Sequence, residues 1–300
     1  MPVGGISTFA RFLYEYGNQE QKDRWLRALV RGDLELGFAI TEPSGGSDVV
    51  SMQTRAERKG DVYVLEGEKG PVGGVRWSDA FVVFAKTSPE KGARGVSAFI
   101  VDANTPGIDK YYFNAIGRKH YGLGGYRFRG VEIPVENRIG EEGKGIYMLF
   151  GFFDWARALY GLECAACGLG ALDELIDFVK NRKTFGQPLG KWESIQFRIS
   201  EHYTRLEMAR WYCYRTLWMK DRGLPISKES AMCKWFSSEA ALAAANDCLQ
   251  MKGAVAYTDE CLDEYRIRTL RGSTIGEGTT EMMKIVIGRE LLGKEFVPYR

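Results

Sequence analysis

The chain has 300 residues, of which 45% are hydrophobic and 27% are charged, and its formal net charge at pH 7 is +2. This length and composition are ordinary for a globular protein with one large domain or two to three packed ones. The 41 basic and 39 acidic side chains nearly cancel, and the longest apolar runs are well short of a membrane span. The sequence therefore indicates no nucleic-acid partner and no transmembrane segment.

Cysteine and histidine usage narrows the chemistry further. All six cysteines lie in the C-terminal half, and the two histidines, His120 and His202, are far apart with no Ser or Cys motif beside them. Cys164 and Cys167 form a CxxC pair in an apolar stretch of small residues, without a second pair, so we expect buried free thiols and no metal site. No secretory signal opens the chain, which favours a reducing compartment: the cytoplasm, or the mitochondrial matrix in a eukaryote.

In chain order, the first predicted element is an amphipathic helix that begins after the N-cap residue Asn18. Gln21 stands at the capping-box position, Trp25 and Leu29 lie on the apolar face, and Gly32 ends the helix. Residues 1–37 are therefore expected to form a short helical segment.

The pattern changes twice after this helix. Residues 38–142 contain short β-branched and aromatic runs separated by Gly, Pro, Asp and Asn, which predicts a mostly antiparallel β domain. Residues 143–300 follow a period near 3.6 and predict a helical bundle. Its helices are expected at 145–182, 192–222, 227–252 and 280–293.

Four motifs occur in one order along the chain. The stretch "FAITEPSGGSD" at 38–48 reads as a strand that runs into a Gly-rich turn with exposed hydroxyls. Further on come "FFDWAR" at 152–157, "NRKTFGQPLG" at 181–190 and "EGT" at 277–279. Together these motifs resemble the acyl-CoA dehydrogenase family over essentially the whole chain.

The resemblance implies an α+β fold with an N-terminal helical domain, a middle antiparallel β domain and a C-terminal four-helix bundle. It also implies FAD as the cofactor and a homotetramer, with FAD near the subunit interfaces. Relatives usually have on the order of a hundred residues before the TEP-type loop, whereas this chain has 40. We therefore expect the N-terminal helical domain to be largely absent.

The reaction that the resemblance implies assigns a role to Glu277. Family members remove a proton from Cα of an acyl-CoA thioester while a hydride leaves Cβ for flavin N5, and the electrons then pass to an electron-transfer flavoprotein. Glu277 matches the base, and its neighbours Gly276 and Gly278 leave room for a substrate beside it. The alternatives are a solvated loop acid or an acid that favours the start of the last helix.

The resemblance also assigns the binding residues. Asp154 and Arg157, one helical turn apart, match residues that contact the pantetheine and acyl-CoA head, and Ser47 lies close to the substrate chain. Arg182 matches a phosphate contact to the FAD of a neighbouring subunit. The full set of expected cofactor contacts is Phe38, Ile40, Thr41, Ser47, Val72, Gly73, Arg182, Thr184, Phe185, Glu193, Gln250, Gly253, Thr279 and Glu281.

Several positions depart from the family pattern. The usual Trp-Ile-Thr that faces the flavin reads Pro71-Val72-Gly73, and carboxylates stand at Glu193 and Glu281. The usual Gly-Gly-x-Gly turn is also altered. Gly276 replaces a large aromatic residue, which indicates a wider acyl pocket for a cyclic or branched acid.

These departures leave several functions open. The first is an FAD-dependent acyl-CoA dehydrogenase, or the same chemistry in reverse as an enoyl-CoA reductase. The second is a non-catalytic or half-site subunit of a heterotetramer. The third is an oxidase that uses oxygen. The sequence does not specify the acyl group.

Overall fold

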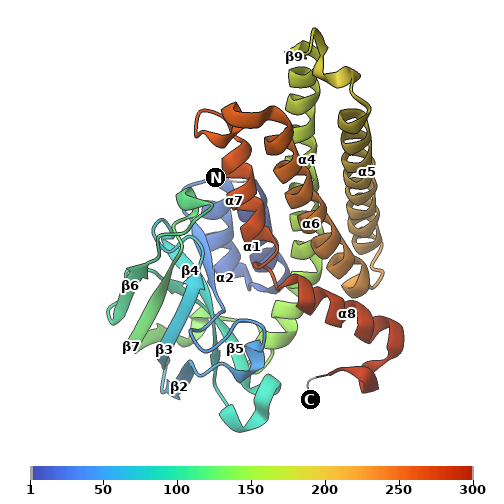
Figure 1. Cartoon of the computed structure of the whole chain (residues 1–300). Coiled ribbons are helices and arrows are strands. Elements are labelled where there is room, and N and C mark those ends of the chain that lie inside the picture. The colour runs from blue at the N-terminus through green and yellow to red at the C-terminus, as the bar shows by residue number, and fades with distance from the viewer. Residues whose placement is uncertain (1–2, 299–300) are drawn as a thin grey trace. The chain divides into compact units, whose positions relative to one another are not determined.

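The computed structural model describes residues 3–298. Contacts divide the chain into two compact units, Met1–Phe152 and Phe153–Arg300. Figure 1 shows the β-strands in the first unit and the long helices that fill the second. Within residues 3–298, none of the helices combines the length and apolar character needed to cross a membrane.

The N-terminal segment is more helical than expected. The helix predicted from Asn18 is present as α2 (Gln19–Gln21), a π-helical turn (Lys22–Leu26) and α3 (Arg27–Arg31). The capping box is confirmed, because the Gln21 amide donates to Asn18 Oδ1 at 2.8 Å and the Asn18 amide donates to Gln21 Oε1 at 3.1 Å. The predicted end is also confirmed, with Gly32 in the left-handed region at φ 77°. A preceding helix, α1 (Val3–Tyr16), was not predicted.

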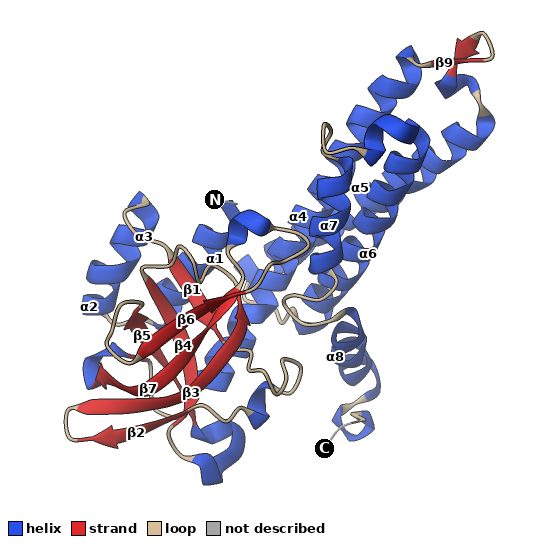
Figure 2. Cartoon of the chain, turned by 60° about the vertical axis from the view of Figure 1, so that its left-hand side comes forward, coloured by secondary structure: helices blue, strands red, loops and turns tan. Residues whose placement is uncertain are grey.

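The first unit is built on one eight-stranded sheet, drawn in red in Figure 2. Seven strands follow the order β6-β7-β3-β2-β4-β5-β8, and the eighth, β1, pairs with β4. Antiparallel pairs predominate, but β1–β4 and β2–β4 are parallel, so the sheet is mixed. The strands are β1 (Leu36–Ala39), β2 (Arg55–Lys59), β3 (Val62–Val72), β4 (Ala80–Lys86), β5 (Val96–Asp102), β6 (Ile108–Tyr112), β7 (Gly124–Pro134) and β8 (Arg138–Ile139).

The second unit is helical, as the 3.6-residue period predicted. Its helices are α4 (Gly145–Asn181), which begins before the unit boundary, α5 (Glu193–Asp221), α6 (Ser227–Lys252), α7 (Asp263–Ser273) and α8 (Thr280–Leu292). Four of the five match the predicted ranges to within two residues, and α7 was not predicted. A short hairpin, β9 (Lys183–Thr184) and β10 (Gln187–Pro188), joins α4 to α5.

Small residues let α4 and α6 run close together and in the same direction. A Cβ built on Gly161 would lie 2.7 Å from the Cys233 carbonyl oxygen, and one built on Gly168 would lie 3.2 Å from Ala241 Cα. Cys164 is buried in the adjoining core, as expected, whereas Cys167 is only partly buried and packs against that core. Because the two helices advance in step, their N-terminal halves lie at one end of the unit and residues 181 and 252 lie at the other.

Candidate active site

The turn between α7 and α8 carries Glu277 in an uncommon backbone conformation. Glu277 has φ 59° and Gly278 has φ 94°, so two successive residues are left-handed. A residue with a side chain adopts this region rarely, because its Cβ crowds the following carbonyl group. The amide of Thr280 donates to the Thr274 carbonyl at 3.1 Å and closes the turn. Because this backbone conformation is unfavourable for Glu277, contacts with other elements are needed to fix the direction of its side chain.

Two cations hold consecutive carbonyl groups of this turn. Arg157 Nε, on α4, donates to the Glu277 carbonyl at 3.0 Å. Lys234 Nζ, on α6, donates to the Gly278 carbonyl at 2.5 Å. Gly278 has φ 94°, which favours glycine, and a Cβ there would displace the ends of two side chains, lying 2.8 Å from Met283 Cε and 3.3 Å from Arg157 Nη2.

The Glu277 side chain does not point into bulk solvent. Its residue is half-buried and its Oε2 atom is shielded from water. The N-cap of α8 is Thr279, whose hydroxyl oxygen accepts the Met282 amide at 3.3 Å, so Glu277 does not cap this helix. Neither alternative reading of Glu277 fits this geometry.

Two cations lie close enough to Glu277 to interact with its negative charge. Burial lowers the pKa of Lys234 to about 8 and holds the pKa of Arg157 below its usual range, while the negative charge of Glu277 acts in the opposite direction on both. The same attraction between opposite charges stabilises the carboxylate. A carboxylate in this state can accept a proton.

Asp154 and Arg157 share a helical face, as expected, but their side chains contact different groups. Asp154 Oδ2 accepts a hydrogen bond from Ser227 Oγ at 2.5 Å, whereas Arg157 contacts the turn that carries Glu277. Burial raises the pKa of Asp154, although the Ser227 hydrogen bond and the charge of Arg157 oppose this shift. Their contact with an acyl-CoA stays a prediction.

In the first unit, a buried ion pair holds the loop that follows β1. Lys69 Nζ lies 2.9 Å from Glu42 Oε1 and donates to the Ile40 carbonyl at 3.0 Å. The same carboxylate accepts the amides of Gln53 at 2.6 Å and Thr54 at 2.9 Å. Burial lowers the pKa of Lys69 to about 8, although the charge of Glu42 opposes this shift. Burial also acts to raise the pKa of Glu42, but the charge of Lys69 and the hydrogen bonds from the amides outweigh it, so that the pKa of Glu42 is lowered.

This ion pair fixes the start of a loop whose tip is open. Thr41 is half-buried, and its carbonyl accepts the Gly70 amide at 2.8 Å. Ser47 is exposed, and a Cβ built on Gly45 would meet nothing within 4 Å. The ring of Phe38, by contrast, stacks against Phe152 at 4.9 Å and belongs to an aromatic cluster of the first unit. The exposed Ser47 at the tip is thus accessible to a ligand.

The altered end of β3 has an aromatic neighbour that the sequence did not reveal. Val72 is buried, and the ring of Tyr121 lies beside Gly73, where a built Cβ would be 2.0 Å from Tyr121 Cε1. The Gly74 amide donates to the Tyr121 carbonyl at 2.8 Å, and Trp77 Nε1 donates to the His120 carbonyl at 2.9 Å. The loop that carries Tyr121 is thereby fixed over β3.

Another group of predicted cofactor contacts, at the far end of α4 and α6, lies away from the Glu277 turn. Arg182 is exposed at the end of α4, roughly 35 Å from Arg157 along the helix at 1.5 Å per residue. The side chain of Phe185 is 95% exposed at the tip of the β9–β10 hairpin, and Thr184 Oγ1 accepts Trp192 Nε1 at 3.1 Å. The exposed residues near this end also include Glu193, Gln250 and Gly253. Within a single chain, these residues therefore lie far from Glu277.

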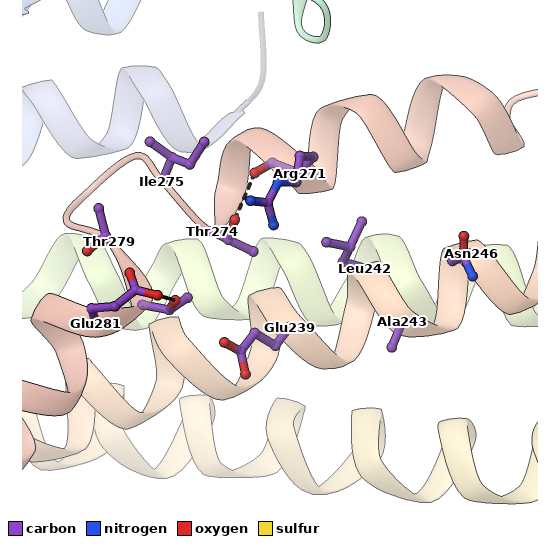
Figure 3. Close-up of a pocket in the computed structure, with 10 residues that line it drawn as sticks. Glu239, Leu242, Ala243, Asn246, Arg271, Thr274, Ile275, Thr279 and Glu281 are labelled. Carbon is purple, nitrogen blue, oxygen red and sulfur yellow. Dashed lines mark hydrogen bonds between the residues drawn. The ribbon is translucent and has the colours of Figure 1, made fainter.

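Figure 3 shows a pocket of about 580 Å³ in the second unit, with Thr279 and Glu281 among its lining residues. Thr280 Oγ1 donates to Glu281 Oε1 at 3.2 Å, and Thr274 Oγ1 donates to the Arg271 carbonyl at 2.9 Å. Hydrogen bonds lower the pKa of Glu281, so it is ionised at neutral pH. Two predicted cofactor contacts thus line one cavity.

Sequence reasoning missed Lys234, the Lys69–Glu42 pair and Tyr121. The available signal for Lys234 was a lysine inside "AMCKWFSSEAALAAA", a helix of small residues with little surface character. The signal for Lys69 was a lysine that interrupts the apolar alternation of β3. No local pattern marks Tyr121, because its contact with Gly73 joins residues far apart in the sequence.

Both units match domains of known proteins. A model of the acyl-CoA dehydrogenase middle domain matches residues 37–131, and a model of the acyl-CoA dehydrogenase C-terminal domain matches residues 143–292. An acyl-CoA dehydrogenase of Bacillus subtilis (strain 168) is 35% identical over 287 residues, covering 93% of this chain and 74% of the relative. Acryloyl-CoA reductase (NADH) of Anaerotignum propionicum is 36% identical over 290 residues, covering 93% and 72%. The solved structure of PigA with FAD and proline has a TM-score of 0.94 at 30% identity, covering 97% of this chain and 76% of that one.

Proposed function

Because the chain belongs to the acyl-CoA dehydrogenase family, we propose that it is an FAD-dependent oxidoreductase that introduces a Cα–Cβ double bond into an acyl-CoA thioester. The observation that carries the proposal is Glu277, a shielded carboxylate on a fixed turn beside two cations. In this reaction the Glu277 carboxylate takes the proton from Cα, and the product is the 2-enoyl thioester. The electrons pass on to an electron-transfer flavoprotein.

The donors present fit FAD. The open tip of the loop at 38–48 offers the Ser47 hydroxyl, and Arg182 offers an exposed guanidinium of the kind that binds phosphate. Thr279 carries a hydroxyl beside the turn, whose oxygen accepts the Met282 amide and whose side chain is hydrogen-bonded to Glu281. Glu193 and Glu281 oppose an anionic ligand, but both are exposed, so solvent and salt screen them.

The chain's own residues account for the proton step. Arg157 and Lys234 hold the turn and favour an ionised Glu277 before the substrate binds. The Glu277 backbone amide lies beside the base and is the group that would polarise the thioester carbonyl, which makes the Cα proton more acidic. FAD, when bound, supplies the acceptor for the hydride that leaves Cβ.

Absorption spectroscopy of the purified protein tests this function. We expect a yellow protein whose flavin band is bleached anaerobically by an acyl-CoA, with formation of the enoyl-CoA. A protein that binds FAD but is bleached by none of a series of short, medium and branched acyl-CoA thioesters would contradict the proposal.

The reverse reaction is supported by the similarity to acryloyl-CoA reductase. By microscopic reversibility the same Glu277, once protonated, would return the proton to Cα. Reoxidation of the pre-reduced protein by an enoyl-CoA, faster than bleaching by the matching acyl-CoA, would assign the physiological direction to reduction.

A half-site subunit is the second candidate. It is favoured by the length of α4, which separates Arg182 from Arg157 and the Glu277 turn that Arg157 contacts. A complete site then needs two chains, which are identical in a homotetramer and different in a heterotetramer. Colourless protein that becomes yellow and active only with a related subunit would favour the heteromer. Peroxide production without an added acceptor would instead indicate an oxidase.

A further inference from the structure

Lys234 is a fully buried cation that the proposed reaction does not by itself require. It lies on α6 with no exposed surface, among small residues that pack against α4. Removing an ammonium group from water is costly unless hydrogen bonds and opposite charges replace the solvent. Its Nζ donates to the Gly278 carbonyl at 2.5 Å. The position of this lysine therefore depends on the turn that carries Glu277.

Groups from three other elements face the Lys234 ammonium. Cys164 and Arg157 approach from α4, Glu277 from the turn and Glu281 from α8. Burial lowers the pKa of Lys234 to about 8, and the charge of Arg157 acts in the same direction. Cys164, Glu277 and Glu281 oppose that shift. The charged form therefore persists at neutral pH, and the acidic side chains help to hold it there.

We propose that Lys234 is a positioning residue for Glu277. Together with Arg157 it fixes two consecutive carbonyl groups of the turn, so that the Glu277 carboxylate stays directed toward the substrate. The inference rests on the proposed function of Glu277 as the base. Glu277 adopts φ 59°, which is unfavourable for a residue with a side chain, so the turn needs partners on both sides of it. Arg157 acts on the carbonyl of Glu277 itself, and Lys234 acts on the next one.

The charge of Lys234 adds to its role as a donor. A neutral donor could also hold the Gly278 carbonyl, but only a cation also favours the ionised carboxylate nearby. As the pH rises through about 8, Lys234 loses its proton, the hydrogen bond weakens and the cation beside Glu277 is lost. The turn should then loosen in the same pH range.

The first test compares Lys234→Met with Leu172→Ala in the full-length, FAD-loaded protein. Leu172 is fully buried in the core of the second unit and lies roughly 22 Å along α4 from Arg157, so its truncation is a control for lost stability. We expect Lys234→Met to lower kcat by roughly 10- to 100-fold, as for a misplaced catalytic group, with KM changed by less than about threefold. Leu172→Ala should lower Tm but leave kcat near wild type well below Tm. Equal losses of kcat in both variants would overturn the proposal.

The second test needs no bound cofactor and no activity. Deuterium exchange of the amides at 276–280, corrected for the intrinsic pH dependence, should show protection in the wild type that falls with a midpoint near pH 8. Lys234→Met should show low protection at every pH. Protection that is equal in the two proteins and flat across this range would contradict the proposal.

A reciprocal variant covers the case in which Lys234→Met does not fold. Glu277→Gln removes the negative charge that opposes deprotonation of Lys234, so the pKa of Lys234, followed by the 13Cε chemical shift, should fall. An unchanged pKa would show that the two side chains are not coupled. If the wild type lacks acyl-CoA activity, the proposed function fails, while exchange and titration still decide whether Lys234 holds the turn.

Discussion

At residue 276 the backbone leaves space for a side chain beside the proposed base. Gly276 is outside the left-handed region, and a Cβ there would lie 3.7 Å from the Gly272 carbonyl oxygen and 3.8 Å from Tyr160 Oη, both ordinary contacts. We therefore expect Gly276→Leu to fold normally and to narrow the acyl pocket. The ratio of kcat/KM for straight-chain over branched acyl-CoA should rise, and an unchanged ratio would reject the wide-pocket interpretation.

Gly73 presents the opposite situation, because the ring of Tyr121 occupies the space beside it. A Cβ at position 73 would lie 2.0 Å from Tyr121 Cε1, so Gly73→Ala should lower Tm. Adding Tyr121→Ala should recover part of that loss, a coupling expected of residues in contact. Thermal unfolding of the four proteins in the cycle measures it; strictly additive effects would show that the ring is not the obstacle.

The candidate site was predictable where a motif fixes the backbone and not where distant residues converge. Glu277 and Gly278 were predicted from the EGT motif that resembles the family pattern, and the structure shows Gly278 in the left-handed region that favours glycine. Lys234 was not, because a charged residue is usually on the surface and only the packing of α6 against α4 buries it.

Among the structural elements, the loop after β1 depends most on a single interaction, the Lys69–Glu42 ion pair. Glu42→Gln leaves Lys69 buried without its counter-charge, so we expect a loss of about 3–5 kcal/mol in unfolding free energy by urea titration. The double variant with Lys69→Met should be less destabilised than Glu42→Gln. A double variant that is as unstable as the single one would argue against an uncompensated charge.

The same pair predicts a pH dependence on the acid side. The pKa of Glu42 is lowered in the folded protein, so the stability it contributes is present above the usual carboxyl value of about 4.3 and is lost as the pH falls through the folded pKa. The slope of Tm against pH in this window should be shallower in Glu42→Gln than in the wild type. Identical slopes would show that Glu42 does not contribute.

The helices show which elements a sequence pattern can identify. α4, α5, α6 and α8 have enough apolar positions at helical spacing to be predicted, and the family resemblance drawn from motifs around them is confirmed. α7 was missed because its buried face includes Asp263, whose carboxylate pairs with Lys252 at 2.8 Å, in place of an apolar residue. The partner of such a residue is known only once the fold is known.

At the scale of the whole molecule, the distance between Arg182 and Glu277 predicts a site shared between subunits. Exposed aromatic and methionine side chains along α5, among them Met208, Trp211 and Trp218, form an apolar face of the kind that marks an interaction site. If neighbouring chains share each site, mixing inactive Arg182→Ala and Glu277→Gln proteins should restore up to roughly a quarter of the wild-type activity in hybrids. Hybrids with no activity, after proven subunit exchange, would contradict a shared site.

The central claim, that Glu277 removes the Cα proton, is tested most directly by anaerobic stopped-flow reduction of wild type and Glu277→Gln with an acyl-CoA. Both proteins should retain the flavin spectrum, because Glu277 does not hold the cofactor in this account. The wild type should be bleached, more slowly with substrate deuterated at Cα, and Glu277→Gln should be slower by at least roughly a thousandfold. A variant that is bleached at a rate near that of the wild type would show that another group takes the proton.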